Sequence, residues 1–278
     1  MSYDDETLHR LQLVELEILK AIDAVCHEHG ITYFLDSGTA LGARRHAGFI
    51  PWDDDIDIGM PRDDYERFLG IAQEALGDEY VVASPEDDDR LAGLFAKVWK
   101  RGTKFFTDET IEAGVEQGIF VDVFPYDRVS GNPSQAKRQL KDCLFWQSVS
   151  YLYHSKAINV PHKGALGAVE KVGCRAVHAL TCKATSPQKI REHFDRAATI
   201  ARRDAQASEM ACMNYVNSGS YPIDVLLPTA EVYFEGHAFP APANIDAYLV
   251  CLYGETWSEL PPEEDRRNHA PRTLDFGD

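Results

Sequence analysis

Two acidic residues spaced two apart are the strongest chemical signal in this sequence. Asp55 and Asp57 alternate with isoleucines in segment 52–58, Trp-Asp-Asp-Asp-Ile-Asp-Ile. In a β-strand, side chains two residues apart point to the same face, about 6.6–7 Å from each other. Both carboxylates can therefore lean towards one cation while the isoleucines anchor the strand in the core. The pattern predicts a rigid metal site.

A third acid lies in a second apolar segment. Asp122 is flanked by Phe-Val and Val-Phe in segment 120–124. An unpaired charge is costly to bury, so we expect Asp122 to have a partner or to be a third acid that faces the metal. Three acids on neighbouring strands suit magnesium, which binds oxygen and commonly bridges carboxylates and phosphates. An exposed strand edge is the alternative interpretation, and the apolar flanks argue against it.

A candidate phosphate-binding segment precedes the acids. Ser37-Gly38-Thr39 follows a short apolar run, 31–35, and leads into a helical stretch at 40–46. Backbone N–H groups at such a helix start can bind phosphate oxygens. Basic side chains could neutralise the remaining phosphate charge. The candidates for that role are Arg44, Arg45, Lys97, Lys100 and Arg101.

The elements that must position these residues can be read from apolar spacing. Apolar residues recur at helical spacing over 6–29, and Gly30 is the expected stop. Further helices are expected at 62–76 and 245–253, and strands at 31–35, 55–59, 91–101 and 119–124. Residues 133–218 are expected to be mostly helical. The sequence predicts an α/β (α+β) fold with a mixed sheet, flanking helices and a helical insertion.

Charge and composition limit the partners. The chain has 278 residues, 28 of them basic and 45 acidic, for a formal net charge of −17. Such a chain repels polyphosphate unless a metal mediates the contact, so no nucleic acid partner is expected. The six cysteines lack zinc-ligand spacing and are expected to be reduced. Without a signal peptide or a long apolar run, a cytoplasmic location is expected.

Several motifs carry a resemblance to a known family. The order Gly-Thr, Asp-x-Asp and a distant single Asp resembles the nucleotidyltransferase-fold superfamily. The motifs similar to the LicD family are Tyr33-Phe-Leu-Asp-Ser-Gly-Thr-Ala-Leu-Gly42, Gly48-Phe-Ile-Pro-Trp-Asp-Asp-Asp-Ile-Asp57 and Gly118-Ile-Phe-Val-Asp-Val-Phe-Pro125. The tail resembles this family in Tyr248-Leu, Tyr253-Gly, Leu260-Pro-Pro262 and Arg266-x-x-His269. Segment 133–218 matches no motif.

The resemblance implies a nucleotidyltransferase-like core and a division of the chain into three parts. Residues 1–132 would form the catalytic core. Residues 133–218 would form a mostly helical insertion, which is a candidate acceptor-binding region. Residues 219–278 would pack back on the core.

The resemblance also implies an activity. LicD-type enzymes are phosphotransferases that move phosphocholine, or less often another phospho-alcohol such as ribitol phosphate, from a CDP-alcohol to a sugar hydroxyl. The expected acceptor is a cell-surface glycan or polysaccharide, or its lipid-linked precursor, which adds an expectation of peripheral contact with the inner face of the membrane. Metal on the CDP diphosphate would stabilise the CMP leaving group. Asp122 would take the proton of the attacking hydroxyl, or serve as a third metal ligand.

The matched motifs imply the remaining site residues. The Trp-Asp-x-Asp-x-Asp pattern, distantly similar to fukutin-related protein, implies that Asp53 joins Asp55 and Asp57 as ligands of Mg²⁺ or Mn²⁺, with Asp54 pointing away. That protein's zinc-binding cysteines have no counterpart here, so no zinc is expected. The expected contacts with the donor are Ser37, Gly38, Thr39, Arg44, Lys97, Arg266 and His269.

Two rival functions stay open. A nucleotidyltransferase would attach an NMP unit to a small molecule, protein or RNA, and would release pyrophosphate from a triphosphate rather than CMP from a CDP-alcohol. A non-catalytic scaffold or antitoxin could share the fold, although loss of activity usually removes the acids that this sequence retains.

Overall fold

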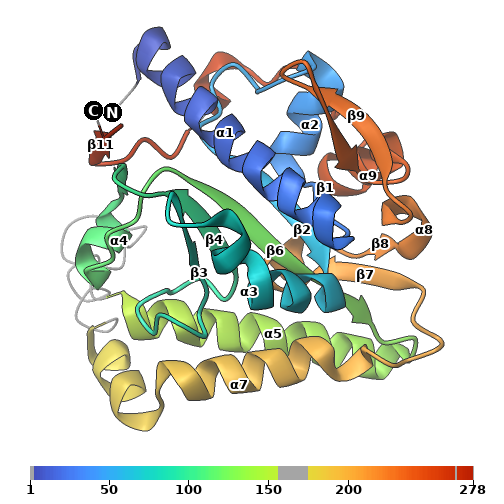
Figure 1. Cartoon of the computed structure of the whole chain (residues 1–278). Coiled ribbons are helices and arrows are strands. Elements are labelled where there is room, and N and C mark those ends of the chain that lie inside the picture. The colour runs from blue at the N-terminus through green and yellow to red at the C-terminus, as the bar shows by residue number, and fades with distance from the viewer. Residues whose placement is uncertain (1–2, 156–174, 267, 278) are drawn as a thin grey trace.

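The computed structural model describes residues 3–155, 175–266 and 268–277. At its centre is a mixed sheet in which β1, β2, β6, β4 and β3 lie side by side, and β7 and β8 continue beyond β6 (Figure 1). These strands are β1 (Phe34–Leu35), β2 (Asp57–Pro61), β3 (Tyr80–Ala83), β4 (Ala96–Lys100), β6 (Phe120–Val129), β7 (Glu209–Cys212) and β8 (Tyr221–Pro222). Only β2 and β6 pair in parallel among these described strands. The predicted α/β fold class is confirmed.

Strand β6 holds the sheet together because it has partners along its whole length. On one side, Asp122 to Tyr126 pair with β2. On the other side, its first residues pair with β4 and its last residues pair with β7. The strand predicted over 119–124 is present and extends to Val129. The predicted strand 91–101 is shorter than expected, since β4 starts at Ala96.

Two long helices, α1 (Asp5–His29) and α3 (Arg62–Leu76), pack together against the sheet. The Asp4 carboxylate accepts a hydrogen bond from the Thr7 backbone N–H at the start of α1. Gly30 ends the helix in the left-handed conformation, with φ of 61°. The predictions of helices at 6–29 and 62–76 are confirmed.

Helix α2 (Ser37–His46) begins earlier than predicted. The Asp36 carboxylate accepts a hydrogen bond from the Ser37 N–H at 2.7 Å and so caps the helix. The tripeptide Ser37-Gly38-Thr39 is therefore the first helical turn, not a turn that precedes a helix at 40–46. Strand β1 is also reduced to two residues of the predicted span 31–35.

Segment 133–218 contributes two helices that lie side by side, α5 (Pro133–His154) and α7 (Pro187–Ala198), at the bottom of Figure 1. Residues 175–184 are also helical, whereas 156–174, part of the predicted insertion, lie outside the described residues. The expectation of a mostly helical segment missed β7, which returns the chain to the sheet beside β6.

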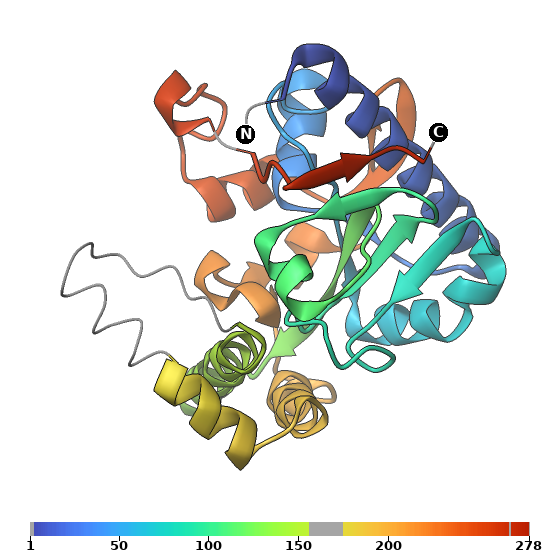
Figure 2. The same cartoon turned by 90° about the vertical axis from the view of Figure 1, so that its left-hand side faces the viewer.

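The C-terminal part packs on the other end of the molecule. Strands β9 (Ala230–Phe234) and β10 (His237–Ala241) form a hairpin, and α9 (Ile245–Tyr253) packs against α2. The helix predicted at 245–253 is thus confirmed. Figure 2 shows β11 (Thr273–Asp275) along the edge formed by β5 (Lys104–Phe106), its antiparallel partner.

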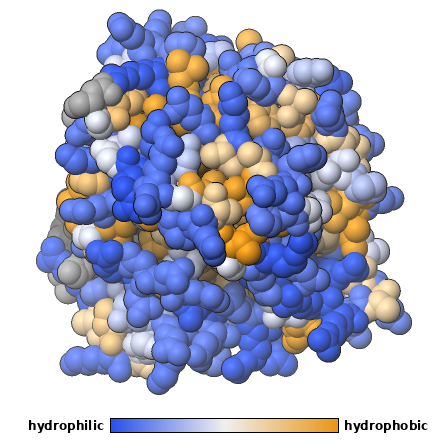
Figure 3. All heavy atoms as spheres, in the orientation of Figure 1, coloured by the Kyte–Doolittle hydropathy of each residue, from blue (hydrophilic) through white to orange (hydrophobic). Residues whose placement is uncertain are grey.

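Short helices fill the connections. They are α4 (Asp108–Ala113), η1 (Thr199–Ala201), η2 (Met213–Ser218), α8 (Ile223–Leu226) and η3 (Glu263–Asp265). The face in Figure 3 is mainly hydrophilic, with apolar residues in separate patches. No helix within the described ranges combines the length and apolar character that crossing a membrane requires.

Candidate active site

The predicted acids border a cavity of about 500 Å³ at one end of the central strands. Asp55, Asp57 and Asp122 line it, together with Lys97 and His269. The walls come from α4, from the ends of α5 and α9, and from η2. The cavity therefore lies where the sheet, segment 133–218 and the C-terminal tail meet.

Strand register places two of the acids side by side. Asp57, the first residue of β2, is the register partner of Asp122 on the parallel strand β6. Lys97 on β4 is the antiparallel partner of Asp122 from the opposite side. Partners on adjacent strands share a face of the sheet, and the Lys97 ammonium lies 2.5 Å from the Asp122 carboxylate. Asp122 thus has the partner that its burial requires.

Asp55 reaches the same cavity from outside the strand. The sequence predicted that Asp55 and Asp57 share one strand, but β2 begins only at Asp57. The segment before it is held by side chains and by neighbouring strands instead: Gln12 donates a hydrogen bond to the Asp53 carbonyl at 2.9 Å, and the Asp122 N–H donates to the Ile56 carbonyl at 2.9 Å. Asp55 therefore approaches through loop geometry rather than strand alternation.

Asp53 and Asp54 lie outside the cavity lining. A Cβ atom on Gly38 would be 2.9 Å from an oxygen of the Asp53 carboxylate, so glycine allows the start of α2 to approach this acid. Asp54 is fully buried. Its carboxylate accepts hydrogen bonds from the Tyr3 hydroxyl and from the His269 backbone N–H, both at 2.8 Å.

His269 connects the tail to the acids. Its Nδ1 lies 3.2 Å from Asp54 and 3.4 Å from Asp55. The hydrogen bond with Asp54, followed by the surrounding negative charges, raises the pKa of His269 to about 9. Asp54, Asp55 and His269 each have a possible metal-ligand atom, and these atoms lie within 4.8 Å of one another. The predicted metal ligands Asp53, Asp55 and Asp57 do not form such a set among the described residues. With this pKa the His269 imidazole carries a positive charge near pH 7 and offsets part of the negative charge of Asp54 and Asp55.

The acids outnumber their cations. Burial raises the pKa of Asp55 to about 6 and that of Asp53 to about 8, with neighbouring carboxylates contributing. Burial, and then Asp55 and Asp122, raise the pKa of Asp57 well above its usual range. The pKa of Asp122 is also raised by burial, although Lys97 opposes the shift. Asp55 and Asp57 both present carboxylate oxygens to the cavity, and such oxygens are the ligands that Mg²⁺ or Mn²⁺ prefers, so these two residues fit a divalent cation.

The start of α2 helps to position the acids through a side-chain hydrogen bond, and the N–H group of its first residue is not free to bind phosphate. The Thr39 hydroxyl accepts a hydrogen bond from the Asp57 N–H at 2.8 Å. Ser37 lines the cavity, but its N–H already donates to Asp36 and, at 3.0 Å, to the Tyr248 hydroxyl. Tyr248 and Tyr126 both hydrogen-bond the buried Asp36 carboxylate.

Two predicted cations are not brought to the cavity. The Arg44 guanidinium pairs with Asp246 of α9 at 2.7 Å. Arg266 donates a hydrogen bond to the Pro261 carbonyl, and its guanidinium lies 4.6 Å from the centre of the Trp52 ring. Both arginines therefore join the tail to the core, and of the predicted basic contacts the structure groups Lys97 and His269 with the acids.

Some residues of the site carried no motif. Tyr151 on α5, Tyr215 in η2 and Tyr253 on α9 all line the cavity. Glu15 on α1 is fully buried, and neither of its carboxylate oxygens has a hydrogen-bond partner within the described chain. Burial, and then the charges of the nearby aspartates, raise its pKa well above its usual range. Glu15 lies four residues after the buried Leu11, so helical spacing could have indicated its burial.

Comparison with known proteins agrees with this geometry. A family profile described as LicD/FKTN/FKRP, nucleotidyltransferase domain, matches residues 30–163. Lipopolysaccharide cholinephosphotransferase LicD of Haemophilus influenzae is 30% identical over 268 residues, which cover 95% of this chain and 96% of that protein. Ribitol 5-phosphate transferase FKRP of Homo sapiens is 30% identical over 112 residues, which cover 40% of this chain but 20% of that protein. The resemblance seen in the sequence is confirmed, and the chain belongs to the LicD family.

Proposed function

We propose that this protein is a metal-dependent phosphotransferase that moves a phospho-alcohol, in the first place phosphocholine, from a CDP-alcohol to a sugar hydroxyl. The acceptor would be a cell-surface glycan or its lipid-linked precursor. The observation that carries the proposal is the row Asp57, Asp122 and Lys97 on three adjacent strands at the cavity. The near full-length similarity to a cholinephosphotransferase supports the choice of substrate class.

Asp55 and Asp57 are the residues that would hold Mg²⁺ or Mn²⁺, with Asp53 available behind them. When bound, the ion would supply positive charge for the diphosphate and for the departing CMP. Asp53, with a pKa of about 8, and Asp57, whose pKa is raised well above its usual range, would have to lose their protons for this role.

Asp122 is the proposed general base. Its carboxylate would accept the proton of the sugar hydroxyl as the hydroxyl oxygen attacks the phosphorus atom of the phospho-alcohol and the bond to the CMP oxygen breaks. The Lys97 ammonium, 2.5 Å away, favours the ionised form that a base requires. Because this ammonium already occupies one carboxylate oxygen, the contact supports the role of base over that of third metal ligand.

A panel of donors tests the proposal. Purified protein with Mg²⁺ and a sugar acceptor should release CMP from CDP-choline, CDP-ribitol or CDP-glycerol. CTP and ATP serve as comparison donors, because a nucleotidyltransferase would release pyrophosphate from them. Turnover of triphosphates with no turnover of any CDP-alcohol would reject the phosphotransferase, and no turnover of either would favour a scaffold or antitoxin.

The cellular location of the proposed reaction would depend on the acceptor. A lipid-linked glycan would bring the enzyme to the inner face of the membrane as a cytoplasmic, peripheral protein. Nucleic acid is not part of the proposed reaction, which agrees with the net charge of −17.

A further inference from the structure

Two tyrosines form a wall of the cavity opposite the tail. Tyr151 comes from the C-terminal half of α5 and Tyr215 from η2, and both line the cavity. Their side chains remain partly open, with exposures of 37% and 46%. No hydrogen bond of either hydroxyl is found among the described residues. Two aromatic side chains with partly exposed surfaces, and with hydroxyls unpaired in the described part of the chain, therefore line the cavity that holds the acids.

The two rings are close to negative charge. Burial, and then the charges of Glu109 and Asp122, raise the pKa of the Tyr151 hydroxyl to about 12. Burial, followed by Tyr151, Asp122 and Asp57, also raises the pKa of Tyr215. Both side chains therefore stay neutral near pH 7. Glu109 lines the same cavity from α4.

Two phenylalanines that line the same cavity already stabilise one cation. The Lys97 ammonium lies 3.9 Å from the centre of the Phe120 ring and 5.2 Å from that of Phe95, within the range of cation–π attraction. Tyr215 is fixed against the same cluster, with its ring 5.3 Å from that of Phe124 in an edge-on arrangement. The phenylalanine faces are engaged by Lys97, and those of the two tyrosines are available for a second cation.

On the basis of the proposed function, we propose that Tyr151 and Tyr215, together with the Glu109 carboxylate, bind the trimethylammonium group of the transferred phosphocholine. A quaternary ammonium has diffuse charge and no hydrogen-bond donor, so aromatic faces and a carboxylate suit it. A polyol such as ribitol would depend on the two hydroxyls rather than on the ring faces, so phenylalanine variants at these two positions separate the two ligands. The phosphate of the same group would then lie towards Asp57 and Asp122, where the bond is broken.

An acceptor sugar stacked on the tyrosines is the competing arrangement. The Glu109 carboxylate lines the cavity near Tyr151 without a salt-bridge partner among the described residues, and its charge favours a cation over a neutral sugar. The two arrangements differ in which substrate loses affinity when the rings are removed, and that difference can be measured.

Leucine and phenylalanine variants test the inference. Tyr151→Leu and Tyr215→Leu should each raise the KM for CDP-choline about 10-fold, the scale of a partly desolvated cation–π contact. Tyr151→Phe and Tyr215→Phe should restore most of that affinity because the ring remains. Choline should inhibit the wild-type enzyme better than 3,3-dimethylbutanol, its neutral carbon analogue, and the leucine variants should lose this preference. Tyr233→Leu, at an exposed tyrosine of β9, is the matched control with unchanged KM.

Inhibition by CMP and the melting temperature separate the outcomes. Both should remain near wild-type values in the leucine variants, since the nucleotide half of the donor is bound elsewhere. Unchanged KM for CDP-choline in the leucine variants, or a rise confined to the KM of the acceptor, would overturn the inference. So would equal losses of CDP-choline and CMP affinity. If the wild-type enzyme releases no CMP from CDP-choline but uses another CDP-alcohol, both this site and the choline assignment fail, whereas phospho-alcohol transfer stands.

Discussion

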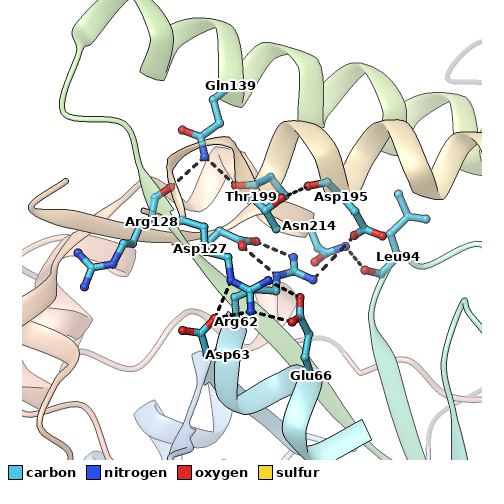
Figure 4. A network of polar contacts seen from close by, with 12 residues as sticks. Arg62, Asp63, Glu66, Leu94, Asp127, Arg128, Gln139, Asp195, Thr199 and Asn214 are labelled. Carbon is cyan, nitrogen blue, oxygen red and sulfur yellow. Dashed lines mark hydrogen bonds and ion pairs between the residues drawn. The ribbon is translucent and has the colours of Figure 1, made fainter. Parts of the chain in front are cut away.

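Strand β6 carries a buried aspartate into each of two very different environments. Asp122 faces the cavity, where the aspartates outnumber Lys97 and His269. Asp127, further along the strand, accepts two hydrogen bonds from the Arg62 guanidinium, at 2.9 and 2.6 Å (Figure 4). The first environment leaves negative charge uncompensated and open to a ligand, whereas the second compensates it within the protein.

The network around Arg62 pairs each of its carboxylates with a guanidinium. Arg62 also lies 3.8 Å from Asp195 of α7. Arg202 pairs with Asp63 and Glu66 at the start of α3. Figure 4 shows Arg62 within the same group of acids. A second cavity of about 400 Å³ lies beside this network and contains none of the predicted site residues. Acids without a cationic partner among the described residues, such as Asp57, distinguish the candidate active site, rather than the size of the cavity or the number of acids.

Arg62→Met should give the largest effect and should act on stability. It leaves Asp127, which is 2% exposed, as a buried charge without its guanidinium, at a cost of about 3–5 kcal/mol. Urea unfolding would measure the loss, and CMP release per folded molecule at low temperature should be retained. The double variant Arg62→Met/Asp127→Leu is the control, because removing both charges should recover most of the stability. A stable single variant would show that the pair contributes little.

Asp57→Asn should have the opposite pattern. Removing one carboxylate from a crowded acidic cluster should leave the melting temperature unchanged or higher, while CMP release falls by about 10²–10³-fold. The physical reason is the lost stabilisation of charge on the diphosphate through the proposed metal. Turnover and melting should be recorded on one preparation at several Mg²⁺ concentrations. Near-normal activity with unaltered Mg²⁺ dependence would remove Asp57 from the metal site.

Lys97→Met should give a smaller, pH-dependent loss. Without the ammonium, the pKa of Asp122 rises further, because only His269 then opposes the effect of burial. A base with a higher pKa is protonated over a wider range, so the acidic limb of the pH profile for turnover should move to higher pH. On that limb, each pH unit of displacement lowers turnover about 10-fold, and turnover should recover at higher pH. Asp122→Asn is the control and should remain inactive at every pH.

Asp195→Asn should give the smallest effect, again on stability. Burial raises the pKa of Asp195 to about 6, so the folded state binds its proton more readily than the unfolded state, whose pKa is about 4. The favourable contribution is complete below about pH 4 and is lost as the pH rises through about 6. Because the side chain is 39% exposed, this loss should stay under about 1 kcal/mol. The melting temperature of the variant relative to wild type should rise between pH 4 and 7, and a fall would identify a favourable ion pair with Arg62.

The predictions from sequence succeeded where one local rule decides the structure. Helical spacing and Gly30 defined α1, and the apolar flanks of Asp122 correctly indicated a buried strand. Strand alternation failed for Asp55, because contacts from Gln12 and β6 hold that segment and neither is adjacent in the sequence. The Asp36 cap was likewise missed, and with it the true start of α2.

The least predictable part of the site is its wall. Tyr151 and Tyr215 reach the cavity only because α5 packs against η2 after β7 has returned to the sheet. Pairing of Lys97 with Asp122 depends on the register of β4 against β6. Such long-range pairings leave no periodic signal, so the acids could be predicted and their surroundings could not.

The two ends of the segment between β6 and β7 meet at Gly131, and this has a consequence for engineering the protein. The Gly131 N–H donates a hydrogen bond to the Asp204 carboxylate. A Cβ atom on Gly131 would lie 2.5 Å from the Gln206 carbonyl oxygen. The chain therefore leaves β6 and returns to β7 at nearly the same place. The excursion between them is topologically a hairpin loop, and doubling the length of such a loop costs only about 0.6 kcal/mol in closure entropy. The helices of this segment, and Tyr151 with them, could therefore be replaced as one unit. Such a replacement would change the cavity surface that contains Tyr151, and with it the substrate specificity, without altering the sheet that holds the acids.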